Sequence, residues 1–419
     1  MEGGEVREQP ATHIADPGKE ARSAAGIPVV PVFDGYRALA ILGVVLLHVF
    51  TVSGVVGEGE SGTLAQINWG LFGRAVEVLF VVSGFVVFLP TVARGGRFGS
   101  WTAYAIRRGA RLLPAYWLIL VISLVLLATV NLEADVPMPS AFSALAHFTG
   151  TQLPASMFSG DVAVGFFVNP PLWTLSVELG FYLVLPFIAA VYFRRPFAGL
   201  AIALLVTVAW DLFFDNYYDI ISLLDLHPNA QDAFRFMFNS GAQLPAWALS
   251  FGLGMTGAWV YVKVSAMEQT ANLKRQVLVV LLVSVMSAAV LAWINGDYLE
   301  QTRQSLWVSM AFSVALAGAM VAIALGPTGF RWPFANRPIR RLGDISYGIY
   351  LSHMLLLIYL GDLLDLPRDG TLGNLLVWML AVIPASVVYG YLSARFLEQP
   401  VRRWARQFGS RQTPDNKAG

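Results

Sequence analysis

Ten apolar segments, each long enough to cross a lipid bilayer, recur along the chain and restrict what it can fold into. Water is absent from the bilayer core, so the backbone of each segment must satisfy its own hydrogen bonds, and segments of this length do so as helices. We therefore predict an all-α, polytopic membrane bundle of about ten helices, as expected from a composition that is 56% hydrophobic and 13% charged. The segments are residues 36–56, 70–90, 112–132, 171–193, 197–215, 241–262, 276–294, 305–325, 342–361 and 372–396.

The basic residues lie in alternate connections between these segments. Of the 28 Lys and Arg residues, the exceptions are Arg74, Arg235, Arg303 and Arg368. By the positive-inside rule both termini are cytoplasmic, which predicts a multi-pass protein of the plasma (inner) membrane with the lipid bilayer, and no nucleic acid, as a partner. We expect residues 1–32 to be a disordered cytoplasmic tail, 33–404 the membrane domain and 405–419 a second cytoplasmic tail.

The first apolar segment contains two polar residues on one face. It reads FDGYRALAILGVVLLHVF, with Arg37 and His48 eleven residues apart. On an α-helix this spacing brings the side chains back to nearly the same face and separates them by about 16 Å along the axis. With Arg37 at the membrane surface, His48 lies near the middle of the bilayer. An ionisable residue there is a functional-site hypothesis, although a histidine bonded to neighbouring helices is the alternative.

Three further ionisable residues are predicted at about the depth of His48. Glu77 and Glu178 lie some 10 Å inside the outer surface on their helices by the same helical rise, and His353 is near mid-depth in the ninth segment. Glu178 shares an i, i+4 stripe with other polar side chains, which predicts local hydrogen bonds to its carboxylate. Each residue alone could instead hold helices together. Four at one level favour a functional site.

A basic layer lies on the predicted cytoplasmic side of these residues. Arg107, Arg108 and Arg111 occur in YAIRRGARLLPAYW, at spacings that point at least two guanidinium groups along one helix face. Together with Arg37 they could bind phosphates in bidentate fashion, although positive-inside bias alone also produces such clusters. No GxxxxGK[ST] loop or dinucleotide fingerprint is present, so ATP and NAD are not indicated, whereas coenzyme A fits. The absence of cysteine excludes a Cys nucleophile.

Several motifs in order along the chain resemble the membrane-bound acyltransferase 3 family. The resemblance extends from Phe33 to about Trp404 and rests on FDGYRALAILGVVLLH, AVEVLFVVSGF, RRGARLLPAYW, LWTLSVELGFYLVLP, LGDISYGIYLSHM and LEQPVRRW. It implies a ten-helix enzyme that transfers an acyl group from cytoplasmic acyl-CoA to a hydroxyl, commonly one on a cell-surface sugar. By position, Arg37 and His48 match the family's essential pair, Arg108 and Arg111 its Arg-x-x-Arg, and Glu178 its fourth-helix carboxylate.

These observations predict an O-acyltransferase in which His48 is the general base for the acceptor hydroxyl and Glu178 orients the imidazole or balances its charge. The donor is expected to be acyl-CoA, with acetyl-CoA the first choice, and no metal is expected. The acceptor is expected to be a glycan sugar or a secreted glycosylated small molecule. The predicted phosphate-binding residues are Arg37, Arg108 and Arg111, and the predicted substrate-binding residues are Glu77, Ser83, Trp173 and His353.

Two other classes of protein remain open from the sequence. Intramembrane His and Glu residues also serve as proton relays, so a proton-coupled transporter is the main alternative. A metal enzyme that uses His48, His353 and Glu178 is a third reading, although no H-E-x-x-H motif supports it. Within the acyltransferase reading, direct transfer and an acyl-histidine intermediate are both possible.

Overall fold

The computed structural model describes residues 28–57, 62–130, 137–159, 162–163, 165–166, 169–215, 241–294 and 306–408. Within these ranges the chain forms helices joined by short connections, and no strand is present. The α-helices are α1 (Val32–Val52), α2 (Thr63–Gly70), α3 (Ala75–Ala93), α4 (Trp101–Thr129), α5 (Ala141–Thr149), α6 (Gln152–Ser156), α7 (Trp173–Arg194), α8 (Pro196–Asp215), α11 (Ala248–Ser265), α12 (Ala271–Ile294), α14 (Leu306–Leu325), α15 (Thr328–Ala335), α16 (Arg337–Leu363), α17 (Leu372–Ser393) and α18 (Gln399–Ala405).

Each of the ten predicted segments contains one long helix, so the prediction of an all-α membrane bundle is confirmed. By length and composition, 8 helical segments of the described chain could cross a membrane. The other two long helices, α11 and α16, are less apolar. The first turns of α16 contain Arg337, Arg340, Arg341 and Asp344, and α11 is only 18 residues long and contains Lys263.

Helices α8 and α12 present most of their apolar side chains to the outside of the bundle. In α12 only 6% of the apolar 18-residue window is buried within the protein, and in α8 only 11%. Their exposed side chains include Val283, Met286, Ile202 and Leu205. Exposed apolar surface of this extent is costly in water and is favourable against lipid tails.

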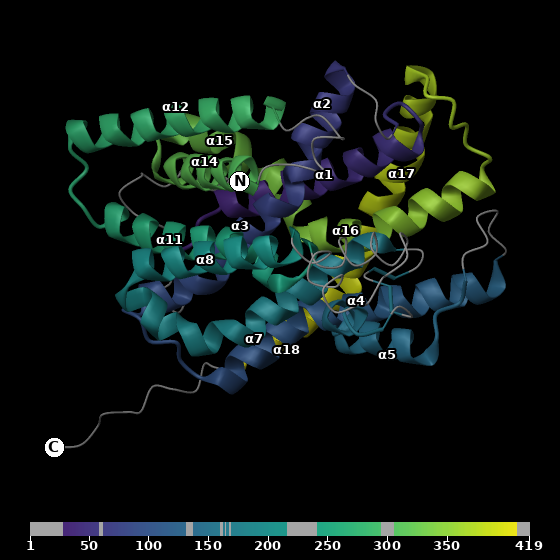
Figure 1. Ribbon diagram of the computed structural model, residues 1–419, viewed down its shortest axis with the longest axis horizontal. Coiled ribbons are helices and arrows are strands. Elements are labelled where there is room, and N and C mark those ends of the chain that lie inside the picture. Colours follow the sequence, from purple (N-terminus) through teal and green to yellow (C-terminus); the bar gives the residue numbers. More distant parts are fainter. Residues whose placement is uncertain are drawn as a thin grey trace, which may run out of the picture.

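The long helices alternate in direction across the bundle. In Figure 1 the α11–α12 connection and the C-terminal end lie on the left, whereas α5 and the α16–α17 connection lie on the right. Helix α1 lies inside the bundle, where it packs against α3 and α16. This arrangement brings residues from both ends of the sequence to the centre.

Helix α4 begins well before the predicted apolar segment. Ser100 caps it by accepting a hydrogen bond from the backbone N–H of Ala103 at 3.3 Å, so the basic stretch that follows is helical. Asn336 caps α16 in the same way through Ile339, and Pro338 occupies its first turn. Both caps place arginine-rich turns in regular helix near one end of the bundle.

Helices α3 and α11 approach each other closely at two glycines. A Cβ atom added at Gly84 would lie 2.3 Å from the carbonyl oxygen of Phe251, and one added at Gly254 would lie 2.1 Å from that of Val81. Small residues allow membrane helices to pack backbone against backbone. Gly84 follows Ser83 directly, so this contact fixes the helix that presents Ser83 to the centre of the bundle.

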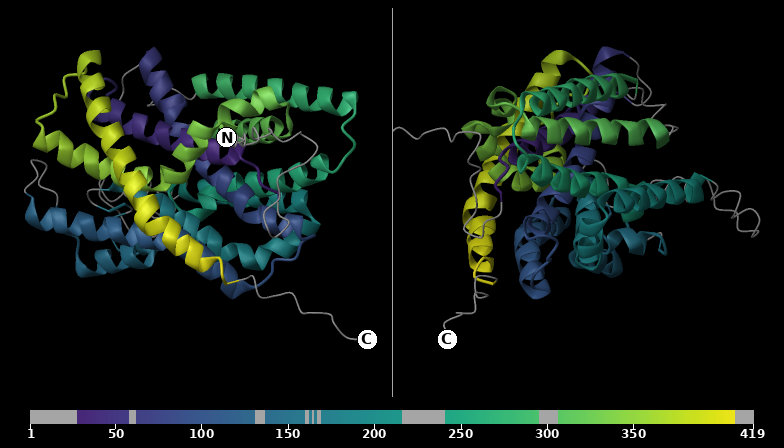
Figure 2. Two further views of the ribbon diagram at one scale, coloured as in Figure 1. Left: turned by 180° about the vertical axis from the view of Figure 1, so that it is seen from behind. Right: turned by 90° about the vertical axis from the view of Figure 1, so that its left-hand side faces the viewer.

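The last helices form one continuous rod. Helix α17 continues through a π-helical turn, η4 (Ala394–Glu398), into α18. Figure 2 shows this rod (yellow) crossing the rear face of the molecule toward the C-terminus. A π-helical turn has a wider spacing than the α-helix and is often found at functional sites.

Most of the predicted tails lies outside the described residues, namely 1–27 and 409–419, as does the predicted outer loop 216–240. The other long outer loop, 133–170, is described in part and contains α5 and α6. The cytoplasmic placement of the termini stays a prediction.

Cysteine labelling tests that placement, because the chain has no cysteine of its own. Arg97 lies between α3 and α4 and Asp369 between α16 and α17, and both are exposed. With an impermeant maleimide on intact cells, we expect Asp369→Cys to react and Arg97→Cys to stay unlabelled until the membrane is permeabilised. Labelling of position 97 in sealed cells would reverse the predicted orientation.

Candidate active site

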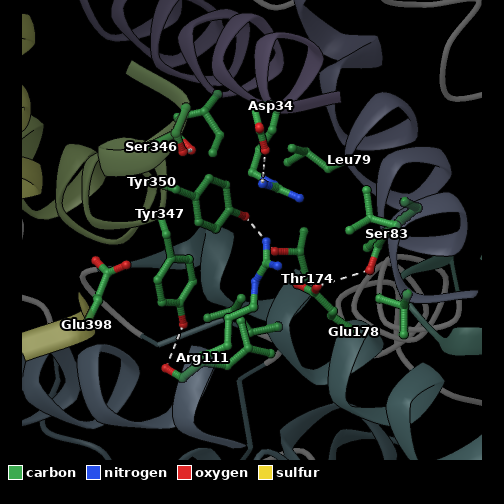
Figure 3. A pocket seen from close by; sticks show the side chains of 18 of the residues that line it. Asp34, Leu79, Ser83, Arg111, Thr174, Glu178, Ser346, Tyr347, Tyr350 and Glu398 are labelled. Atoms are coloured by element: carbon green, nitrogen blue, oxygen red, sulfur yellow. Dashed lines mark hydrogen bonds and ion pairs between the residues drawn. The ribbon is translucent and has the colours of Figure 1, made fainter. Parts of the chain in front are cut away.

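A cavity of about 170 Å³ lies at the centre of the bundle between α1, α3, α4, α7, α16 and the end of the α17–α18 rod (Figure 3). Its polar lining residues are Asp34, Arg37, Ser83, Arg111, Thr174, Glu178, Tyr182, Asp344, Ser346, Tyr347, Tyr350, Glu398 and Arg402. Four of the residues predicted from the sequence therefore meet in one cavity, namely Arg37, Ser83, Arg111 and Glu178.

Glu178 is held by two hydroxyl groups. Its Oε1 accepts a hydrogen bond from Ser83 Oγ at 3.1 Å and another from the hydroxyl of Tyr182, one helical turn further along α7. The predicted polar stripe on this helix is therefore confirmed. The guanidinium of Arg108 lies 5.4 Å from the ring centroid of Tyr182, so it supports the tyrosine that orients the carboxylate.

Arg37 and Arg111 line the same cavity as this carboxylate. Both interact electrostatically with Glu178 and with each other. Arg37 also pairs with Asp34, but the distance from Arg37 Nη1 to Asp34 Oδ1 is 3.6 Å, which is longer than a charge-assisted hydrogen bond. Two guanidinium groups therefore lie near one carboxylate, and the ion pair of Arg37 with Asp34 is a loose one.

Tyr350 links the cavity to a pair of histidines. Its hydroxyl lies 2.6 Å from Thr174 Oγ1 in the cavity wall, and its backbone carbonyl lies 2.6 Å from Nδ1 of His353. The imidazole of His353 lies beside that of His48, with the ring centroids 5.2 Å apart. The histidine pair is thus next to the cavity, one helical turn along α16 from Tyr350.

The hydrogen bond of His48 fixes its tautomer. Nδ1 lies 2.8 Å from the carbonyl oxygen of Val44, and because a carbonyl only accepts, Nδ1 must carry the proton. Nε2 of a neutral His48 is then the basic nitrogen. Among the described residues Nε2 has no hydrogen-bond partner, and the side chain is half-buried, so this nitrogen is available to take a proton.

His353 has the same tautomer for the same reason. Its Nδ1 donates to the Tyr350 carbonyl, and its Nε2 is buried with no hydrogen-bond partner in the described part of the chain. A buried polar atom without a partner costs free energy, so it is expected where a ligand supplies the missing partner. His48 and His353 together present two basic nitrogens.

No hydrogen bond joins Glu178 to His48 in the described residues, so the structure gives no support to the expectation that Glu178 orients the imidazole; the alternative, that it balances the charge of His48, stays a prediction. Oε1 of Glu178 accepts hydrogen bonds from the hydroxyl groups of Ser83 and Tyr182. The imidazole of His48 is instead oriented by the hydrogen bond from its Nδ1 to the backbone carbonyl of Val44. The backbone group lies one turn earlier on the same helix. Within the described residues no three His, Asp or Glu side chains are grouped to hold a metal ion.

Five predicted site residues lie outside the cavity lining, namely the two histidines described above and Arg108, Glu77 and Trp173. Arg108 stacks on tyrosine rings, as described above. Glu77 is 5% exposed and pairs with Arg74 at 3.1 Å, and Arg74 also donates to Ser309 on α14, so this pair joins helices. Trp173 packs at the start of α7 with its ring centroid 5.9 Å from that of Trp247.

The cavity also contains residues to which the sequence analysis gave no role. Glu398 and Arg402 enter from the α17–α18 rod, and Asp34, Asp344 and Tyr350 enter from α1 and α16. All but Asp34 lie in the two motifs near the C-terminus, LGDISYGIYLSHM and LEQPVRRW, which were the available signal. Four carboxylates thus face three arginines in one small space, an arrangement that can bind a charged ligand by exchanging ion-pair partners.

Comparison with known proteins matches the chain to one family model and to several proteins named as O-acetyltransferases. The family profile described as "Acyltransferase domain" matches residues 30–395. The chain is 23% identical over 390 residues to the peptidoglycan O-acetyltransferase OatA of Listeria monocytogenes, covering 89% of this chain and 56% of that protein. It is 26% identical over 338 residues to Nodulation protein 10 of Rhizobium leguminosarum bv. viciae, covering 78% of this chain and 82% of that protein.

The O-acetyltransferase OatA of Staphylococcus aureus is also similar, at 21% identity over 382 residues, with 89% of this chain and 57% of that protein covered. The chain thus spans a little more than half the length of the OatA proteins. No solved structure matches.

Proposed function

This chain belongs to the acyltransferase family whose profile matches most of its length, and on that premise we propose that it is an integral-membrane O-acyltransferase of the plasma membrane. The proposed donor is a cytoplasmic acyl-CoA, with acetyl-CoA the first choice because relatives are named as O-acetyltransferases. The proposed acceptor is a hydroxyl of a cell-surface glycan or a secreted glycosylated compound. Listeria OatA is named for peptidoglycan, which is a sugar polymer.

The observation that carries this proposal is the spacing of charge and base along α1. Arg37 lines the cavity together with Arg111, and His48 follows on the same helix face, about 16 Å further along the axis. An acyl-CoA has its phosphates and its thioester at opposite ends of a long pantetheine arm. Phosphates bound at the arginines therefore allow the thioester to reach the level of His48.

In the proposed reaction, Nε2 of His48 takes the proton of the acceptor hydroxyl as the oxygen attacks the thioester carbonyl. The C–O ester bond forms and the C–S bond breaks. The proton held by His48 then passes to the departing sulfur, so the products are the acylated acceptor and free coenzyme A. His353, whose Nε2 is also unprotonated, accepts a hydrogen bond from the acceptor and helps to position it.

Glu178 has a different part in this proposal from the one expected from the sequence. It balances the charge of Arg37 and Arg111 and keeps their side chains directed into the cavity. Ser83 and Tyr182 hold its carboxylate in one orientation. The residue thus supports donor binding, while Val44 provides the hydrogen bond that His48 needs.

The test is release of coenzyme A by purified protein in nanodiscs, followed with a thiol reagent. The chain has no cysteine, so the reagent detects only the product. We expect acetyl-CoA turnover that rises when a glycan acceptor is added, together with a labelled acetyl ester on that acceptor. Proton-coupled transport of the acceptor into sealed vesicles, with no thiol release under any condition, would instead support the transporter alternative.

A further inference from the structure

The C-terminal motif LEQPVRRW provides a second set of charged groups to the cavity. Glu398 and Arg402 both line it, and they come from the π-helical turn η4 and from α18. Ser393 Oγ donates to Glu398 Oε1 at 2.9 Å across five positions, the spacing of a π-helical turn. The turn therefore rotates Glu398 onto the buried face, where the residue is only 3% exposed.

The two ion pairs in the cavity wall are looser than the Arg74–Glu77 pair outside it. Arg402 Nη2 lies 3.7 Å from Glu398 Oε2, and Arg37 lies 3.6 Å from Asp34, whereas Arg74 and Glu77 are 3.1 Å apart and share a hydrogen bond. Charge-assisted N–H···O bonds are about 2.7–2.9 Å long. In addition, Arg402 Nε is buried and has no hydrogen-bond partner among the described residues. The guanidinium of Arg402, a cavity-lining residue, thus has unused hydrogen-bonding capacity.

Arg402 lies on the same side of the site as Arg111. The two arginines and Glu398 interact electrostatically, and Figure 3 shows Glu398 and Glu178 on opposite sides of Arg111. Arg402 belongs to the helix that ends near the C-terminus, so it lies at the predicted cytoplasmic mouth.

We propose that Arg402 is a phosphate-binding residue for the donor, and that the carboxylate of Glu398 holds the guanidinium of Arg402 at the cavity until a donor phosphate takes the place of that carboxylate. This proposal rests on the proposed acyl-CoA donor. The loose pair can exchange a carboxylate for a phosphate oxygen, because an arginine fork binds both in the same bidentate geometry. The exchange predicts that a substitution of Arg402 weakens the binding of the donor, whereas a substitution of Glu398 strengthens it.

Binding of coenzyme A to the full-length protein in nanodiscs, measured by calorimetry, tests the exchange. We expect Arg402→Gln to raise the Kd for coenzyme A by about tenfold, the lower end of what a hydrogen bond to a charged group contributes. Glu398→Gln should lower the Kd, because its amide oxygen still accepts from Ser393 but no longer competes with the phosphate. The matched control is Arg403→Gln, which removes the same charge from an exposed neighbour and should change nothing.

Pantetheine, which has the arm of coenzyme A without its phosphates, separates phosphate binding from structural damage. Arg402→Gln should bind pantetheine as the wild type does. An equal loss for pantetheine and coenzyme A, a Kd for Arg402→Gln equal to that of Arg403→Gln, or weaker binding by Glu398→Gln would overturn the proposal. Failure of the wild type itself to bind coenzyme A would instead reject the proposed donor.

Discussion

Replacing His48 with alanine is expected to lower kcat for acyl transfer by about a hundred- to ten-thousand-fold, the usual contribution of a general base. Nε2 of His48 is the nitrogen that would take the acceptor proton, and alanine provides no substitute. The more informative variant is His48→Asn, whose amide nitrogen can still donate to the carbonyl of Val44, as Nδ1 does at 2.8 Å. It should fold like the wild type and lose as much activity as His48→Ala.

His147 provides a matched control. Its Nδ1 also lies near the carbonyl four residues earlier, 2.7 Å from that of Ser143, but it belongs to α5 and does not line the cavity. His147→Asn should therefore keep the wild-type kcat per folded molecule. The measurement is thiol release at saturating donor and acceptor on monodisperse protein. Near-wild-type turnover by His48→Asn would reduce His48 to a packing residue and remove the proposed base.

The helices and the central polar residues could be predicted from the sequence because both depend on strong, local physical rules. A segment of about 20 apolar residues must form a helix in lipid, and all ten predicted segments do so. Helical spacing also predicts that Arg37 and His48 share a face, that Glu178 bonds to Tyr182, and which residues enter the centre from α1 and α7. These inferences need no knowledge of how helices pack.

Several partners of these residues were not predicted. Some depend on contacts between helices far apart in sequence, such as Ser83 with Glu178, whereas others, such as Arg74 with Glu77, are local pairs that compete with the cavity for the side chain. Glu77 and Glu178 look alike in the sequence as carboxylates at similar depth, yet Arg74 neutralises Glu77 while Glu178 enters the cavity. Arg108 and Arg111 also look alike in the sequence. The guanidinium of Arg108 lies over the rings of Tyr104 and Tyr182, whereas Arg111 lines the cavity. The π-helical turn before Glu398 has no spacing signal in the sequence.

Removal of the Arg111 guanidinium is expected to weaken donor binding with little effect on chemistry. The proposed contacts to the donor phosphates are equal in the ground state and the transition state, so their loss raises donor KM and leaves kcat at saturating donor nearly unchanged. Hydrogen bonds between charged groups contribute about 1.5–3 kcal/mol, which predicts a rise of about ten- to a hundred-fold in donor KM for Arg111→Ala. Arg111→Lys keeps the charge but loses the fork, and its donor KM should be intermediate.

The control for this prediction is Arg107→Ala on the same helix. The guanidinium of Arg107 donates to the carbonyl of Phe408 at 2.7 Å and does not line the cavity, so donor KM should stay at the wild-type value. Acceptor KM should be unchanged in all three variants, because the acceptor is proposed to approach from the opposite side of the membrane. If Arg111→Ala lowers kcat at saturating donor and leaves donor KM unchanged, Arg111 acts on the reacting groups and not on the phosphates, and the proposed division between a phosphate site at the arginines and a chemical site at the histidines is wrong.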